Sequence, residues 1–88
     1  MQIIGTGTKS IPGARNFLGL VCRSSGATVT AVAYKGASVV SGEEIGACIA
    51  AGTNAYNTDE PVFSCATDKG LFVNSVGLGG VTLIRYET

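Results

Sequence analysis

The chain has 88 residues, with 6 basic and 6 acidic side chains, no histidine, and hydrophobic residues at 45% of its positions. This length corresponds to one small domain, which is marginally stable alone and gains stability from association, disulfides or metal. The zero net charge argues against nucleic-acid binding, and no apolar run reaches the roughly 20 residues of a membrane helix. The first residues lack the basic and apolar regions of a signal peptide, so we expect synthesis in a cytoplasm.

The first segment, residues 1–13, is rich in glycine, threonine and serine after its first four residues. Its glycines and proline oppose regular structure, whereas Ile3, Ile4 and Ile11 are apolar residues that a free tail would not need. We therefore expect an extended N-terminal arm that contacts another chain, or an edge strand, rather than a part of the core. A β-sandwich domain is expected over residues 14–88.

The next two segments have the composition of strands. Residues 16–23 are apolar on both faces, which is typical of a strand that is buried on both sides. Residues 28–35 alternate, so that Val32 and Tyr34 fall on the face opposite three smaller apolar residues. Both residues are candidates for a contact face.

The middle of the chain contains a Gly/Ser loop and an ambiguous segment. The loop, residues 36–42, carries Val39 and Val40 side by side, and a loop rarely exposes adjacent valines without a partner. Residues 43–51 alternate like a strand, but they also contain good helix formers. Gly46 in the middle of the segment favours the strand over a short helix.

The last third of the chain predicts a turn region and a hairpin. Residues 52–60 are polar and turn-forming, and they contain Tyr56, an aromatic suited to an interface. A Gly-rich link exposes Leu78 at the tip of the closing hairpin. The expected strands of this region are residues 61–65, 71–76 and 81–87. The segments together predict an all-β fold of six to seven strands, a small β-sandwich for which a jelly roll is one available arrangement.

The residues needed for catalysis are missing from the sequence. Without histidine there is no imidazole base, and the adjacent carboxylates at 43–44 and 59–60 point to opposite faces of a strand. The stretch 5–10 imitates a phosphate loop, but Thr8 stands where that loop needs glycine, and Pro12 breaks the helix that should follow. We expect no enzyme activity, no cofactor and no metal.

The three cysteines, Cys22, Cys48 and Cys65, are far apart and lack the spacing of a metal site. Their neighbours are apolar or small, so we expect three free and mostly buried thiols. A Cys22–Cys48 or a Cys48–Cys65 disulfide is the alternative.

The closing sequence GLFVNSVGLGGVTLIRYE, residues 70–87, is the most distinctive part of the chain. It resembles the final hairpin of the small β-sandwich structural proteins of tailed bacteriophages, and the match extends loosely through residues 28–32 and 36–42. The resemblance implies a virion protein that is made in the host cytoplasm. Such proteins decorate or cement a capsid, usually as homo-oligomers, and a trimer is favoured.

Assembly is therefore the expected function. The expected partners are copies of the chain itself and a major capsid protein or another virion protein, with neither nucleic acid nor membrane. A glycan- or receptor-binding β-module of a phage tail or fibre is the alternative, and an uncharacterised cellular β-domain is a further one. The expected interface residues are Ile3, Ile4, Ile11, Val32, Tyr34, Val39, Val40, Tyr56 and Leu78.

Overall fold

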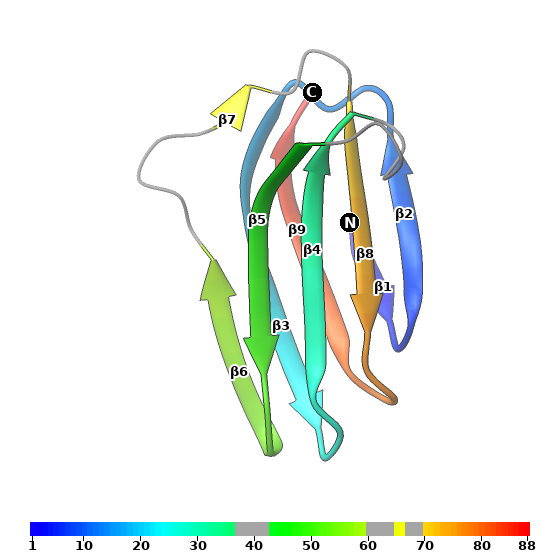
Figure 1. Cartoon of the computed structure of the whole chain (residues 1–88), viewed down its shortest axis with the longest axis vertical. Coiled ribbons are helices and arrows are strands. Elements are labelled where there is room, and N and C mark those ends of the chain that lie inside the picture. The colour runs from blue at the N-terminus through cyan, green and yellow to red at the C-terminus, as the bar shows by residue number, and fades with distance from the viewer. Residues whose placement is uncertain (37–42, 60–64, 67–69) are drawn as a thin grey trace.

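The computed structural model describes residues 1–36, 43–59, 65–66 and 70–88, which form two antiparallel sheets packed face to face (Figure 1). Sheet A has the order β1 (Gln2–Ile4), β9 (Val81–Glu87), β3 (Asn16–Ser25) and β6 (Thr53–Asp59), and β7 (Cys65–Ala66) pairs with the start of β3. Sheet B has the order β2 (Gly7–Ile11), β8 (Leu71–Val76), β4 (Val29–Lys35) and β5 (Glu43–Ala50). The described residues contain no helix, so the prediction of an all-β, small β-sandwich is confirmed.

The connections between the two sheets follow one rule. Each of the pairs β1/β2, β3/β4, β5/β6 and β8/β9 places one strand in each sheet, and the two sheets contain these pairs in the same spatial order. With the short β7 set aside, this is the arrangement of an eight-stranded jelly roll. The side formed by β5 and β6 and the side formed by β1 and β2 are the two opposite edges of the sandwich (Figure 1).

The strand predictions with clear alternation are confirmed. In β4, Val29, Ala31 and Ala33 are buried, whereas Val32 and Tyr34 on the other face are only partly covered. The expected strands at 71–76 and 81–87 coincide with β8 and β9. The segment at 43–51 is the strand β5, not the short helix that was its alternative, and a β-bulge opposite Ala33 accommodates its extra residue.

The prediction of an N-terminal arm is wrong, whereas its alternative, an edge strand, is confirmed, because β1 and β2 are edge strands of the two sheets. Residues 2–4 pair with β9 and residues 7–11 pair with β8, so both halves of the segment belong to the sheets. Gly5, with φ of 71°, makes the turn between them. Gly7 lies inside β2, where a Cβ atom would sit 3.4 Å from the Ile3 side chain. These glycines permit a tight corner instead of preventing regular structure.

Two further predictions for the chain need correction. Residues 52–60 were expected to be a turn region, but β6 pairs with β3 there, because neighbouring strands can recruit turn-forming residues into a ladder. The described residues form nine strands, whereas six to seven were expected. Most of the expected strand at 61–65 lies outside the described residues, and only its last residue belongs to β7.

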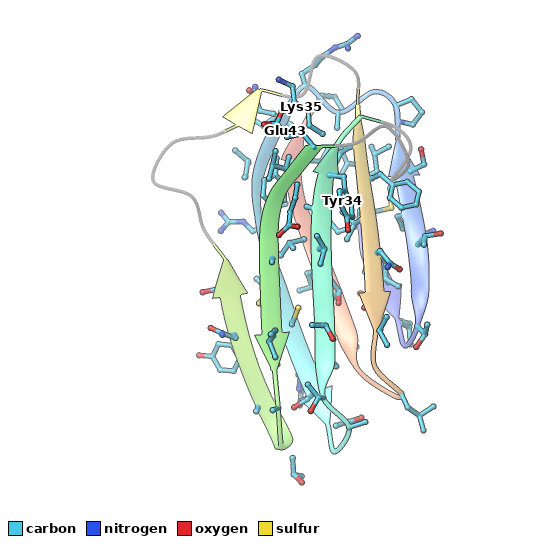
Figure 2. The ribbon with its side chains drawn as sticks, viewed as in Figure 1. Tyr34, Lys35 and Glu43 are labelled. Carbon is cyan, nitrogen blue, oxygen red and sulfur yellow. The ribbon has the colours of Figure 1, made fainter. Side chains whose placement is uncertain are left out.

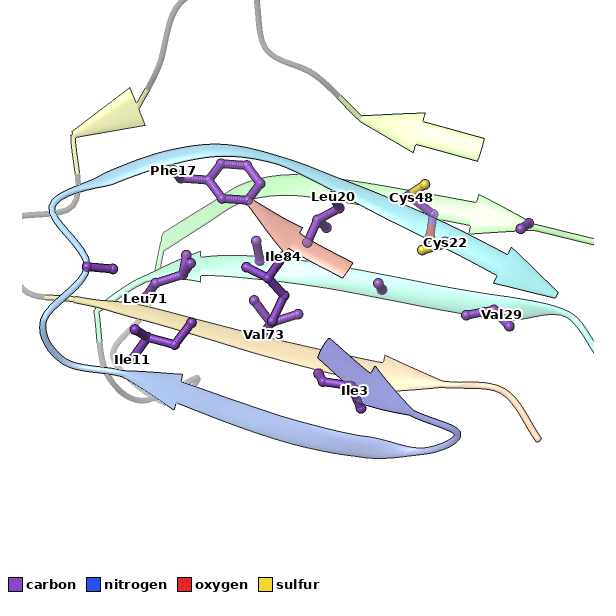
Figure 3. Packing of buried hydrophobic residues seen from close by; sticks show 14 residues of the cluster. Ile3, Ile11, Phe17, Leu20, Cys22, Val29, Cys48, Leu71, Val73 and Ile84 are labelled. Carbon is purple, nitrogen blue, oxygen red and sulfur yellow. Dashed lines mark hydrogen bonds between the residues drawn. The ribbon is translucent and has the colours of Figure 1, made fainter. Parts of the chain in front are cut away.

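The core lies between the sheets and is filled by side chains from nearly every long strand (Figure 3). Phe17, Leu20 and Leu71 are its largest fully buried side chains, and Ile84 packs with them. Burial of such side chains contributes about 1.5–3 kcal/mol each. The hydrophobic effect at this centre therefore holds the two sheets together.

One layer of the core is polar. The hydroxyls of Thr82 in sheet A and Ser75 in sheet B lie 3.0 Å apart, and Ser75 also donates to the backbone carbonyl of Gly5 at 3.3 Å. Both residues are fully buried, and none of the described buried side-chain nitrogens or oxygens lacks a partner. Because a buried hydroxyl is costly unless it is bonded, this pair fixes how the two sheets sit against each other.

The two glycines Gly77 and Gly80 pack tightly against neighbouring residues beside the β8–β9 turn. A Cβ atom on Gly80 would lie 2.1 Å from Cγ2 of Val29 and 3.0 Å from the carbonyl oxygen of Arg23. Gly77 has a similar neighbour, because its Cβ would lie 2.7 Å from the same Val29 methyl group. Glycine therefore lets the buried Val29 fill the space beneath the hairpin.

Candidate functional site

The outer surface of sheet B is nearly free of charge. We call it the B face, and the register of the strands defines it by the outward residues Thr8, Ser10, Thr30, Val32, Tyr34, Glu44, Ala47, Ile49, Phe72, Asn74 and Val76. Glu44 is the only charged residue among them. Ile49 and Val76 are 56% and 51% exposed. The B face therefore presents a flat, weakly polar surface of the kind that packs against protein.

Two aromatic rings lie at one end of the B face. Tyr34 and Phe72 are cross-strand partners, with ring centroids 6.5 Å apart and planes inclined by 56°. Each ring is partly covered by the other, which leaves both half-buried. Figure 2 shows Tyr34 at the same end as Lys35 and Glu43, which face each other in the register of β4 and β5. This end combines an aromatic pair with a charged rim.

The outer surface of sheet A, which we call the A face, carries two charged residues, Arg23 and Arg85. Its outward residues are Gln2, Ile4, Val21, Arg23, Tyr56, Thr58, Val81, Leu83 and Arg85. Two rows of cross-strand partners run across β1, β9, β3 and β6. One of these rows contains Ile4, Val81, Arg23 and Tyr56 in that order. Tyr56 is 73% exposed and Ile4 is 69% exposed.

A hollow of about 240 Å³ opens on the A face. It is lined by Gln2, Val21, Arg23, Tyr56, Val81 and Leu83. A second hollow adjoins it at the β8–β9 turn and shares Arg23 and Val81 with the first. The combination of an apolar floor with one guanidinium, one phenol and one amide can bind a ligand that is part apolar and part polar.

The structure divides the nine expected interface residues into three groups. Ile3 and Ile11 are buried in the core of their own chain, so their expected contact with another chain is corrected. Val32 and Tyr34 lie on the B face, Ile4 and Tyr56 lie on the A face, and Leu78 is 84% exposed at the β8–β9 turn. Val39 and Val40 lie outside the described residues.

Several surface residues were missed by the sequence reasoning. Phe72 is one of them, because its alternation with the buried Leu71 and Val73 places it on the B face. Leu83 and Val21 are cross-strand partners on the A face. The alternation of residues 81–87 could have identified Leu83, whereas the continuous apolar run around Val21 gave no signal of which side faces outward.

Cys22 and Cys48 are free and buried, as expected, and they come from opposite sheets. The Cys22 thiol donates to the backbone carbonyl of Cys48 at 3.8 Å, and its sulfur lies 3.8 Å from the hydroxyl of Thr82. Burial, with a smaller contribution from the neighbouring Cys48 thiol, raises the pKa of Cys22 to about 12. The thiol is thus an inert part of the polar layer at neutral pH. The side chain of Cys65 lies outside the described set.

The raised pKa of Cys22 predicts a loss of stability in alkali. The folded chain keeps the thiol proton up to about pH 12, whereas an ordinary thiol loses it near 9.0. The contribution of the protonated thiol to folding stability is therefore complete below the ordinary pKa and is lost as pH rises from that pKa to the raised one. At about pH 10 the loss attributable to this thiol is about 1 kcal/mol. Between about pH 8 and 10, the free energy of unfolding from urea denaturation should decrease less for Cys22→Ala than for the wild type. Equal decreases would contradict the assignment.

The described residues contain no group of three or more side chains able to hold a metal ion. They also include no helix that is long and apolar enough to cross a membrane. No protein-family model, no curated protein and no solved structure matches the chain.

Proposed function

We propose that the chain is a non-enzymatic structural protein of a virion, a capsid decoration subunit that assembles with copies of itself and with the capsid shell. The observation that carries this proposal is the B face, where eleven outward residues include a single charge. Depletion of charge and enrichment of aromatic residues distinguish the centre of protein interfaces from other surface.

The size of the sandwich supports the same function. Its Cα atoms extend over 36 × 25 × 18 Å, so one broad face of 36 × 25 Å has an area of about 900 Å². A stable interface needs about 800 Å² from each partner. One face of this small domain is therefore sufficient to attach it to a larger protein surface.

The topology is compatible with assembly but does not specify it. Jelly rolls occur in viral capsid proteins, lectins and cupins, and a fold alone does not determine a function. The resemblance of residues 70–87 to phage structural proteins favours the first of these classes. The lack of histidine in the chain and of a metal-binding group among the described residues is consistent with a role that depends on contact.

The test of the proposal is cosedimentation of the purified chain with empty shells made from the major capsid protein of the same virus. Wild type should bind the shells, and Ile49→Asp combined with Val76→Asp should bind at least about tenfold more weakly, because each carboxylate must be desolvated in the contact. Leu83→Asp on the A face is the matched control and should bind like wild type. A wild-type chain that stays in the supernatant at tens of micromolar would overturn the proposal.

The glycan- or receptor-binding alternative is favoured by one observation, the hollow on the A face that Tyr56, Arg23 and Gln2 line together. An exposed phenol ring beside a planar guanidinium and an amide is a suitable surface for a sugar ring. Glycan-array binding that Tyr56→Ala abolishes, with shell binding absent, would favour this function over capsid decoration.

A further inference from the structure

The four edge strands of the sandwich differ in charge. On one side, β2 carries Lys9 and its neighbour β1 carries no charged side chain. On the opposite side, β5 begins with Glu43 and Glu44. Both acidic residues and Lys9 are exposed. The β2 edge of sheet B therefore carries one basic side chain and the β5 edge carries two acidic ones. The two edges lie on opposite sides of the sandwich (Figure 1).

The directions of the strands allow the two sides to meet. Strands alternate in direction across both sheets, since all pairings are antiparallel. A neighbouring copy related by rotation about an axis parallel to the strands would therefore bring β2 antiparallel to β5 and β1 antiparallel to β6. Such edge pairing supplies backbone hydrogen bonds along each sheet.

The register brings the opposite charges close together in that arrangement. Ile11 is level with Glu43, because the cross-strand pairs Ile11–Leu71, Leu71–Lys35 and Lys35–Glu43 follow one another across sheet B. Lys9 is two residues from Ile11 and thus on the same side of the sheet. Diagonal neighbours of this kind on adjacent strands lie about 7–8 Å apart, which is within reach of long side chains.

The remaining edge strand lacks the features that usually prevent pairing. Within β6, residues 53–58 contain no proline, lysine or other charged residue, and Tyr56, Asn57 and Thr58 are exposed. Natural edges are normally protected by charge, proline or short length. β1 is protected by its length of three residues, whereas β6 has seven. None of the described strands pairs with the outer edge of β5 or of β6, so the described part of this side can accept a further strand.

We propose that a second copy of the chain docks edge to edge, with its β2 and β1 beside β5 and β6 of the first, and with Lys9 facing the acidic start of β5. The proposal rests on the assembly function above and specifies the contact between copies. The contact uses two different surfaces, so it closes into a ring when the rotation per copy permits. The side of the sandwich measures 36 × 18 Å, and each copy uses two such sides.

The test is a charge exchange, measured by sedimentation velocity over a range of concentrations at about 50 mM salt, where surface charges are weakly screened. Wild type should form one closed oligomer. Lys9→Glu and Glu43→Lys should each dissociate about tenfold more readily, because each places like charges at the contact. The double variant, with the two charges exchanged, should recover to within about threefold of wild type.

Two controls keep the result specific. Arg85→Glu reverses a charge on β9, an inner strand of sheet A, and should associate like wild type. Urea denaturation of each variant establishes that it is folded, which matters for Glu43→Lys because Lys35 lies opposite that position.

The outcomes separate this contact from the general assembly function. Wild type that is oligomeric but indifferent to Lys9→Glu would overturn the edge contact, as would an increase in association, since the charge would then protect the edge. A monomeric wild type would also overturn it. Cosedimentation with shells is a separate measurement. Capsid decoration can therefore be supported while the edge contact is contradicted, and the edge contact can be supported while capsid decoration is contradicted.

Discussion

A chain that lacks residues 1–10 is expected not to fold. The deletion removes β1 and all but one residue of β2, so it uncovers an edge of β9 and an edge of β8 and takes Ile3 out of the core. Circular dichroism and urea denaturation should show no cooperative unfolding transition. A truncated chain with an unchanged transition would restore the interpretation of this segment as an arm.

The adjacent residues Ile3 and Ile4 provide a matched pair of substitutions that tests whether β1 packs into the fold. Ile3 is 5% exposed and Ile4 is 69% exposed, although they have the same side chain. Ile3→Ala should lower the free energy of unfolding by about 2–5 kcal/mol, because it leaves a cavity. Ile4→Ala should change it by about 0.5 kcal/mol or less. Equal effects would mean that β1 does not pack as described.

Gly80→Ala is expected to lower the free energy of unfolding by about 3 kcal/mol, since overpacking a filled core costs about 1–3 kcal/mol and occasionally more. The added methyl group would overlap Cγ2 of Val29, which is fully buried and stiff at χ1. The carbonyl oxygen of Arg23 closes the other side of the space. The hairpin would have to move away from β4.

Gly13→Ala is the control, because a Cβ atom at Gly13 meets nothing within 4 Å. It should leave the urea midpoint almost unchanged. A second variant, Gly80→Ala with Val29→Ala, removes the overlapping methyl group and should be less destabilised than the sum of its two changes. Strict additivity would show that the clash is not the cause.

The fold was predictable from sequence where local pattern and burial agree. In β4 the small residues face the core and the larger Val32 and Tyr34 face outward, so alternation alone specified the strand and its orientation. The hairpin of β8 and β9 was equally clear, because two β-rich runs flank a Gly-rich link. These elements depend little on the rest of the chain.

The prediction failed where distant partners decide the structure. Thr53, Asn54 and Asn57 favour turns locally, yet pairing with β3 makes this segment a strand. The N-terminal segment becomes sheet because β8 and β9, about 70 residues later, offer it two edges. Neither partner can be identified from local composition.

The candidate surfaces were predictable in part for the same reason. Alternation identified Val32 and Tyr34, and polarity identified Tyr56 as an exposed aromatic. It could not reveal that Tyr56 shares a hollow with Val21 and Leu83, since that depends on the register of three strands.

The position of the last two strands determines when the chain can fold during synthesis. β9 lies between β1 and β3, and β8 lies between β2 and β4, so neither sheet can be completed until the C-terminal hairpin leaves the ribosome. Before then, β4 and β5 are the only consecutive described strands that pair with each other. Sandwiches with such distant pairings fold in about milliseconds to seconds, and the nascent chain must keep its unpaired strands from other chains until residues 71–87 join them.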